Sequence, residues 1–364
     1  MSAEAVAPVP DRRRELLTAS VGLSIVLVLL VAGLWWAKWV PYLAKADNLA
    51  AVRHWSGSAI LDSAGRPGAA PSLMGAWRFA RVYFEAVWEA LLVALVVAAG
   101  VDALAPRRWL LAVMDRRTPR SQAVVGGLLS LPSMMCTCCT APMAVGLRRR
   151  GVPLAGTFAY WLGNPVLNPA VLVFLALVLP WQYVATRMVI GVILVFGVST
   201  LLGRMLERPT ETSEGSLVTA CQAESDIMRL RDMPLRYLRS LLRFAMILVP
   251  EYAVVVLGVG LISATFSDFG AQATRLGIIA LVIAACVATL LVVPTGGEIA
   301  VILAAIAAGA GTGLIGVLLI ALPAVSLPSM VMVGRTLGWR ATGSAAAAVA
   351  LMALLSGGLL TALS

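Results

Sequence analysis

Long apolar runs constrain the fold of this chain more than any other feature of its sequence. A helix that crosses a bilayer needs about 20 consecutive apolar residues. Seven continuous runs meet that length, at residues 19–42, 83–105, 153–179, 182–203, 241–265, 313–334 and 341–363. Only 13% of the residues are charged, whereas soluble domains carry about 25%. The pattern predicts an all-α polytopic membrane protein with about seven full spans. The first run lacks a clear cleavage site, so we expect a span there rather than a signal peptide.

The charged residues exclude several functions. The net charge is +10, but the arginines flank apolar segments, where they set membrane orientation, so no nucleic-acid partner is expected. The two lysines, Lys38 and Lys45, do not precede Ser or Thr, which excludes a Walker A loop. The single histidine, His54, falls in an expected external loop. We therefore predict no enzyme, no catalytic residues and no cofactor, and a lipid bilayer and a small molecule or metalloid as partners.

Two further apolar segments are interrupted. Residues 121–147 contain Pro132 and Pro142, and residues 275–311 contain Pro294, Gly296 and Gly297. Proline interrupts a helix and frees a carbonyl, and glycine permits a sharp reversal. Irregular backbone at membrane depth is tolerated only inside protein or along a watery cavity. These five residues are the predicted breaks of two re-entrant hairpins.

The arginines indicate how these segments lie in the membrane. The linker 106–120 carries five arginines, and Arg148, Arg149 and Arg150 follow the first interrupted segment. If the N-terminus is cytoplasmic, a segment that enters and returns keeps both basic groups on the cytoplasmic side. We therefore predict a multi-pass protein of the inner (plasma) membrane with a cytoplasmic N-terminus.

The order span, hairpin, span, span occurs twice, and the second copy starts from the opposite side of the membrane. Inverted repeats with broken helices are common in transporters. The predicted organisation comprises an N-terminal span and external loop, a first repeat, a cytoplasmic linker and a second repeat, at residues 1–80, 81–204, 205–240 and 241–364. Two unrelated bundles are the alternative.

Three of the five cysteines stand together, at Cys136, Cys138 and Cys139. Thiolates bind soft partners such as Cu(I) and trivalent arsenic. A zinc site usually has four ligands and CxxC spacing, so no resident metal is predicted. Reversible capture of a soft solute is favoured, and the alternative is that the cysteines are small packing residues.

Polar residues elsewhere in the apolar segments add candidates. Asn164 and Asn168 would share a face of one helix and line a path, or simply bond to neighbouring helices. Glu298 is a candidate for proton coupling, or it caps the following half-helix. Arg187 is expected near the outer surface beside the anchors Trp181 and Tyr183.

The two remaining cysteines are given no role in the site. Cys221 falls in the cytoplasmic linker. Cys286 is expected to pack inside a hydrophobic arm.

The stretch "CTCCTAPMAVGLRRRGVPLAGTFAYWLGNPVLNPAVLV" (136–173) resembles the core of the predicted permease family that includes the ArsP organoarsenical efflux permeases. The matching features are the cysteine turn, Pro142, the "GL" and basic cluster, Gly151 and the two Asn-Pro pairs. The resemblance covers roughly residues 80–360, so the N-terminal span lies outside it. It implies an inner-membrane permease and, for characterised members, export of trivalent organoarsenicals through cysteine thiols. The second half has "PTGGE" and no cysteine cluster, so the match does not secure the substrate.

Three functions follow from these residues. The first is a secondary transporter that exports a soft thiophilic solute, with Cys136, Cys138 and Cys139 binding it, Asn164 and Asn168 lining the path and Glu298 coupling a proton. The second is a membrane thiol oxidoreductase that uses the Cys138–Cys139 pair, although a vicinal disulfide is strained. The third is an assembly protein without transport. Assembly into a homo-oligomer is left open.

Overall fold

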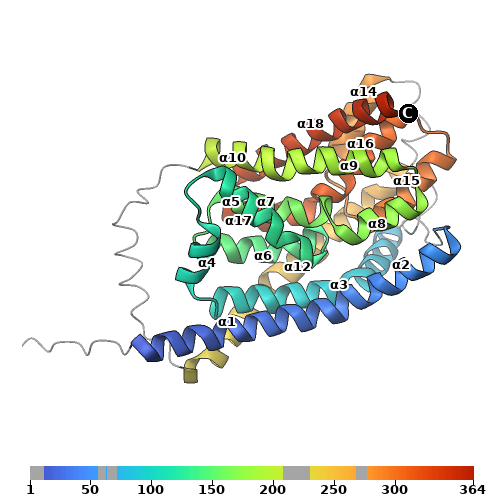
Figure 1. Cartoon of the computed structure of the whole chain (residues 1–364). Helices are drawn as coiled ribbons and strands as arrows, with labels where there is room; N and C mark the ends of the chain where they lie inside the picture. Colours follow the sequence, from blue (N-terminus) through green and yellow to red (C-terminus); the bar gives the residue numbers. More distant parts are fainter. Residues whose placement is uncertain (1–11, 56–62, 64–71, 208–229, 268–276) are drawn as a thin grey trace, which may run out of the picture.

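The computed structural model describes residues 12–55, 63, 72–207, 230–267 and 277–364. Within these ranges every regular element is a helix. Six helices are long and apolar enough to cross a membrane, or up to seven if one bent pair is a single span. The chain is thus a helical bundle, with the helices drawn roughly side by side in Figure 1, and the expectation of a multi-pass membrane protein is confirmed.

The N-terminal helix is longer than predicted. It runs without a break through α1 (Arg12–Leu34), the π-helical η1 (Trp35–Trp39) and α2 (Val40–Val52), and lies along one side of the bundle (Figure 1). The expected external loop at 43–80 therefore begins only after Val52, because "LAKADNLAAV" consists mainly of good helix formers. The next helix, α3 (Leu73–Ala103), is capped by Ser72, whose hydroxyl accepts from the Gly75 N–H at 3.0 Å.

The first interrupted segment forms a helical hairpin. After α4 (Arg107–Met114), α5 (Pro119–Ser130) starts with Thr118 as N-cap and proline at the first helical position, a favourable start. A short 3₁₀ turn, η3 (Leu131–Ser133), leads to α6 (Thr137–Arg149). Pro132 lies in this turn, as expected. Pro142 lies inside α6, which continues through it. The break is thus confined to residues 131–136.

The run 153–179, predicted as one helix, is broken. It forms α7 (Leu154–Val166) and α8 (Pro169–Val178), and the return is α9 (Trp181–Val192), the π-helical η4 (Ile193–Val198) and α10 (Ser199–Leu206). Pro169 has no N–H to bond the carbonyl four residues earlier, so the helix ends before it.

The second half follows a related order. A 3₁₀ turn, η5 (Leu230–Asp232), precedes α12 (Met233–Ser267). The second interrupted segment gives α14 (Ile278–Ala288) and α15 (Gly297–Ala307). The run 313–334 is also broken, into α16 (Thr312–Ala324) and α17 (Leu327–Leu337) with a bend of 51°. The last helix is α18 (Trp339–Leu363).

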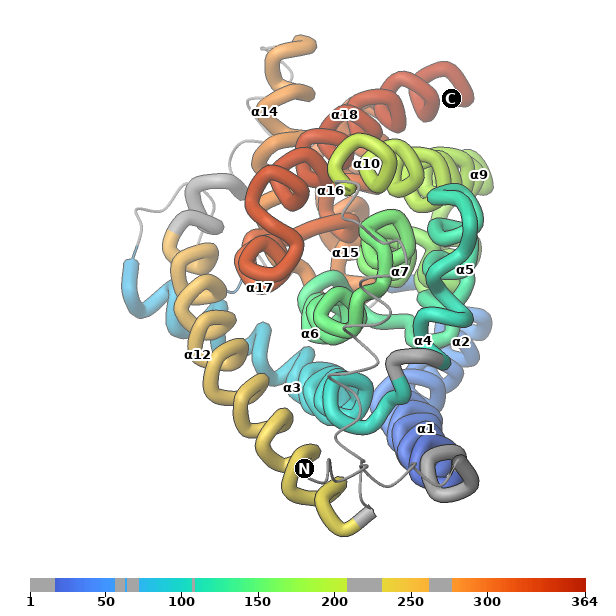
Figure 2. The backbone as a smooth tube through the Cα atoms, turned by 90° about the vertical axis from the view of Figure 1, so that its left-hand side faces the viewer, coloured from blue at the N-terminus to red at the C-terminus, as the bar shows by residue number. Residues whose placement is uncertain are grey.

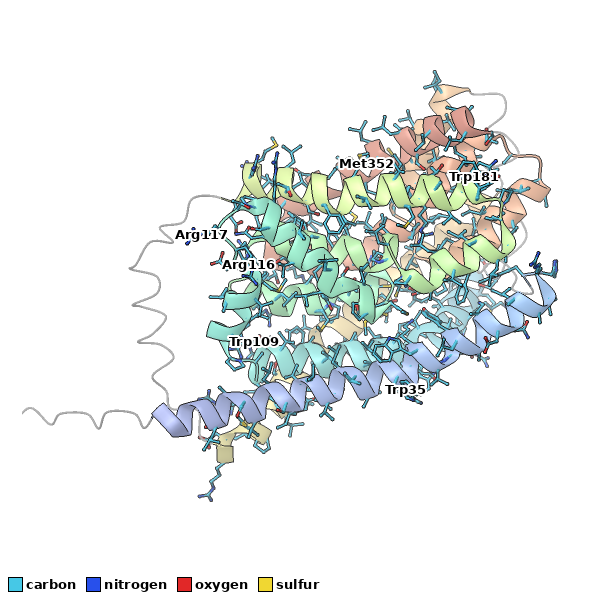
Figure 3. The ribbon with its side chains drawn as sticks, in the orientation of Figure 1. Trp35, Trp109, Arg116, Arg117, Trp181 and Met352 are labelled. Carbon is cyan, nitrogen blue, oxygen red and sulfur yellow. The ribbon has the colours of Figure 1, made fainter. Side chains whose placement is uncertain are left out.

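One end of the bundle gathers several basic linkers. Arg150 donates to the Asp102 carbonyl at the end of α3, and Arg148 pairs with Glu207, after α10, at 3.0 Å. The ends of α3, α6 and α10 therefore meet, and the α5–α6 hairpin returns to the end from which it started. Figure 3 shows Arg116 and Arg117 at this end, far from Trp181.

Two helices occupy the centre of the bundle. Figure 2 shows α6 and α7 surrounded by α3, α5, α10, α12 and α17. Every residue of α7 is buried. The outer helices expose many large apolar side chains, including Trp35, which points away from the bundle in Figure 3. An apolar exterior is what a lipid-facing surface requires.

The close approach of α5 and α7 depends on Gly126. A methyl group there would lie 2.2 Å from the Gly156 carbonyl oxygen. We expect Gly126→Ala to cost about 1–3 kcal/mol of stability, since overpacked sites must shift backbone. Thermal unfolding of the detergent-solubilised protein measures this. Gly358→Ala in α18 is the matched control, because its added methyl meets nothing within 4 Å. Equal melting temperatures for the two variants would contradict the prediction.

Candidate functional site

The three clustered cysteines meet at the turn of the α5–α6 hairpin. Cys136 is the N-cap of α6, and Cys138 and Cys139 lie in its first turn. The Cys136 sulfur is 3.3 Å from that of Cys138 and 3.0 Å from that of Cys139. All three thiols are free and buried. Their sulfur atoms lie within 4.8 Å of one another.

The backbone before α6 explains this convergence. Met134 adopts a left-handed conformation with φ 47°, and Cys136 is extended. The chain therefore turns into α6 directly after Cys136. Residues three apart on a helical turn are neighbours, so Cys136 lies next to Cys139. Two sulfur ligands at about 2.3 Å from one centre lie at most about 4.6 Å apart. The cluster is thus compact enough for two or three sulfurs to bind a single soft centre.

Asn164 holds the hairpin tip in place. Its side-chain oxygen accepts from the Ser133 hydroxyl and, at 3.3 Å, from the Met135 N–H. Its amide nitrogen donates to the Tyr160 carbonyl at 3.2 Å. The structure therefore brings Asn164 next to the thiol turn, but in a contact that fixes the turn rather than on an open face.

Helices from both halves of the chain surround the thiol turn. The Tyr83 hydroxyl on α3 is 3.0 Å from the Cys138 sulfur, and Tyr252 on α12 packs against Tyr83 with ring centroids 6.0 Å apart. The Thr137 hydroxyl lies 3.3 Å from that of Ser326, at the start of α17. Sequence reasoning missed both tyrosines. Both tyrosines stand inside or next to apolar runs of the sequence. A phenol hydroxyl that is buried there needs a polar partner, and this requirement could have indicated a contact with the thiols.

The N-terminal helix also reaches the turn. The Trp39 indole donates to the Pro132 carbonyl at 2.9 Å, and the Tyr42 hydroxyl lies 3.5 Å from the Met134 carbonyl. Lys38 donates to the Tyr42 hydroxyl at 3.0 Å. The Lys38 side chain is buried.

The second break has a different chemistry. Gly296 has φ 83°, which favours glycine, and Gly297 begins α15. Pro294 lies in the same break. Glu298, in the first turn of α15, is 2% exposed and forms an ion pair with Arg187 at 3.1 Å.

The expected position of Arg187 near the outer membrane surface stays a prediction, but its side chain is buried in the protein and does not share the exposure of the anchor Trp181. Its side chain is fully buried, whereas Trp181 is 66% exposed. Six residues at about 100° each place the two side chains about 120° apart around α9. Trp181 therefore faces outward, while Arg187 faces the interior.

Arg187 satisfies carbonyls that the α7–α8 break frees. It donates to the Pro165 carbonyl at 2.8 Å and to the Val166 carbonyl at 3.0 Å. The Pro165 carbonyl has no helical donor, because the residue four positions later is Pro169. One arginine thus joins the break in the first half of the chain to Glu298 in the second half.

Asn168 occupies this break, and the expectation that it shares a helix face with Asn164 is wrong. It is the N-cap of α8, and its oxygen accepts from the Ala170 N–H at 3.1 Å and the Val171 N–H at 3.3 Å. Its buried amide nitrogen has no hydrogen-bond partner among the described residues.

The N-terminal helix passes both breaks. Tyr42 links Lys38 to the thiol turn, and the Lys45 ammonium lies 3.8 Å from the centre of the Trp55 ring and 5.8 Å from that of Phe174 in α8. About two helical turns, roughly 10 Å, separate the two lysines. The thiol turn and the Arg187–Glu298 pair are therefore neighbouring sites along one side of the bundle.

The remaining candidates lie apart from these sites. Cys286 is exposed rather than packed as expected, since α14 lies at the edge of the bundle. His54 is exposed after α2. Glu251 pairs with Arg335 at 3.2 Å. Cys221 falls outside the described residues.

Comparison with known proteins agrees with this architecture. The family model ArsP_1, described as a predicted permease, matches residues 72–361. The chain belongs to this predicted permease family. The UPF0718 protein YraQ of Escherichia coli (strain K12) is 34% identical to the permease over 339 residues, which cover 92% of this chain and 94% of that protein. No solved structure matches it.

The two matches differ at the N-terminus. The family model begins at residue 72 and omits the N-terminal helix. The alignment with YraQ covers 92% of the chain, which is more than the family model covers. Because the family model ends at residue 361 of 364, the additional aligned residues lie before residue 72 and reach the N-terminal helix. The resemblance to the permease family is confirmed, and the sequence similarity to YraQ extends beyond the part of the chain that the family model covers.

Proposed function

We propose that the permease is a secondary transporter that exports a soft, thiophilic solute such as a trivalent organoarsenical. The observation that carries this proposal is the cluster of three free, buried thiols within 4.8 Å at the turn of a helical hairpin. Sulfur ligands of this kind favour soft centres.

The capture step is a reversible exchange. Two thiols replace the two hydroxyl groups of a compound R–As(OH)₂, which forms two As–S bonds and releases two water molecules. Water reverses the exchange and returns the solute with both thiols protonated. Cys136 is central to this step, because its sulfur is the one within 3.3 Å of both others.

The remaining polar residues form the rest of the path. The free amide nitrogen of Asn168 is a donor for the solute, whereas Asn164 fixes the thiol turn. Glu298 accepts the coupling proton, and its ion pair with Arg187 holds the resting state.

The proposed topology has a cytoplasmic N-terminus in the inner membrane. The hairpins α5–α6 and α14–α15 are re-entrant, and residues 81–204 and 241–364 form inverted repeats joined by a cytoplasmic linker at 205–240. The meeting of the ends of α3, α6 and α10 supports a hairpin that starts and finishes on one side. The contact between Thr137 and Ser326 supports facing breaks in the two halves.

A thiol oxidoreductase gains no support from the site. All three cysteines are at most 4% exposed. Thiol–disulfide exchange needs access for an attacking thiol. The described conformation exposes none of the three sulfurs to an attacking thiol, whereas a transporter opens its site in another state of its cycle.

Uptake of methylarsenite from the medium into everted membrane vesicles tests the proposal. We expect Cys136→Ser/Cys138→Ser/Cys139→Ser to lower accumulation at least about tenfold, because serine oxygens are hard ligands. Cys286→Ser is the matched control and is expected to transport normally, since this thiol is exposed on α14. Undiminished accumulation by the triple variant would remove the thiols from the mechanism.

A further inference from the structure

Lys38 is a buried charge that the proposed function does not use. Its side chain is 7% exposed, and its hydrogen bond goes to the neutral Tyr42 hydroxyl. No carboxylate among the described residues forms an ion pair with it. An ionisable residue within a membrane segment is costly and commonly marks a substrate pathway.

The position of Lys38 prevents it from reaching the membrane surface. About 20 Å of helix separates it from Val52, the end of α2. Lysines near helix ends extend their charge to the interface. Lys38 instead points inward and donates to Tyr42, which lies near the Met134 carbonyl.

The local backbone also singles out this position. Lys38 lies in the π-helical segment η1 (Trp35–Trp39), and π-helical turns inside α-helices are frequent at functional sites. The adjacent Trp39 is hydrogen-bonded to Pro132 in the thiol turn. The π-helical turn thus fixes the lysine against the hairpin tip.

We propose that Lys38 is a specificity-determining residue of the thiol site. Through Lys38 the site selects soft solutes that carry a negative charge over neutral soft solutes. This inference rests on the proposed function. Tyr42 links Lys38 to the thiol turn, because the Tyr42 hydroxyl accepts from Lys38 and lies 3.5 Å from the Met134 carbonyl. A solute held by Cys136 and Cys139 can therefore present its remaining substituent to the Lys38 ammonium. A carboxylate on that substituent supplies the missing countercharge in a site of low dielectric constant, where a buried pair is strong.

A matched pair of arsenicals tests the inference on the full-length protein. Phenylarsenite and 4-carboxyphenylarsenite share the soft centre and the ring and differ only in the carboxylate. Binding to the purified permease in detergent is measured by quenching of tryptophan fluorescence. We expect wild-type protein to bind the carboxylate at least about tenfold more tightly.

Three variants separate charge from structure. Lys38→Met is expected to abolish the preference while it still binds phenylarsenite, which serves as an internal measure of folding. Lys38→Arg is expected to retain the preference. Arg78→Met, which removes an exposed cation at the start of α3, is the matched control.

The outcomes distinguish this inference from the proposed function. Equal binding of both compounds by wild-type protein, or a preference that survives in Lys38→Met, would overturn the role of Lys38. If wild-type protein binds neither compound through its thiols, the proposed function itself is overturned. If Lys38→Met does not fold, equal binding of the two compounds by wild-type protein still overturns the role of Lys38.

Discussion

Replacement of Arg187 by methionine is expected to lower the free energy of unfolding by about 3–5 kcal/mol, because it leaves a buried carboxylate without its partner. Glu298 is 2% exposed and pairs with this side chain. The carbonyls of Pro165 and Val166 would lose their donors as well. A lower melting temperature in detergent micelles measures the effect.

A double variant tests whether the unpaired carboxylate of Glu298 causes the loss of stability. Arg187→Met/Glu298→Met removes both charges and is expected to recover most of the loss, since an apolar pair often replaces a buried ion pair without cost. Arg81→Met is the control, because the Arg81–Glu85 pair is exposed and such pairs contribute only about 0–1 kcal/mol. Equal melting temperatures for Arg187→Met and Arg81→Met would show that the buried pair does not stabilise the fold.

The ion pair also shows where sequence reasoning reached its limit. Apolar length predicted the membrane bundle, because one property of consecutive residues decides whether a helix can span. Arg187 and Glu298 are 111 residues apart in the chain, and no local pattern connects them. The exposed Trp181 suggested an interface, although α9 turns Arg187 toward the interior.

The α7–α8 break had a local signal that was interpreted in another way. Asn168 followed by Pro169 is a favourable N-cap and first helical residue, and the structure uses both in this role. The prediction of a single span agrees with the length and hydropathy of Leu154–Val178, but it missed the new helix start inside that span. Freed carbonyls at the break then required a buried donor, which Arg187 supplies.

The thiol site was predictable in part. Three cysteines in four positions next to Pro132 indicated a cluster at a turn, and their sulfurs do converge. Lys38 was not assigned to the site, because its helix lies outside the family resemblance. Its proximity depends on the contact of Trp39 with Pro132, 93 residues away. Contacts of this kind arise from the packing of the whole bundle.

Removal of both charges of the buried pair is expected to uncouple transport from the proton gradient while solute exchange continues. Among the described acidic residues Glu298 is the least exposed, at 2%, so it is the candidate acceptor of a proton inside the bundle. Arg187→Gln/Glu298→Gln is suited to this test, because it leaves no unpaired buried charge. Its thiols are unchanged, so the solute is still bound.

Everted vesicles with an imposed pH gradient measure this effect. One pH unit corresponds to 1.36 kcal/mol for each proton exchanged per solute. Wild-type protein is therefore expected to raise the ratio of internal to external methylarsenite by up to about tenfold for each coupled proton and each pH unit. The double variant is expected to reach no accumulation, yet to exchange labelled for unlabelled solute. Arg81→Gln/Glu85→Gln removes an exposed pair as the matched control and is expected to accumulate normally. Gradient-driven accumulation by the double variant would place the coupling proton on a residue other than Glu298.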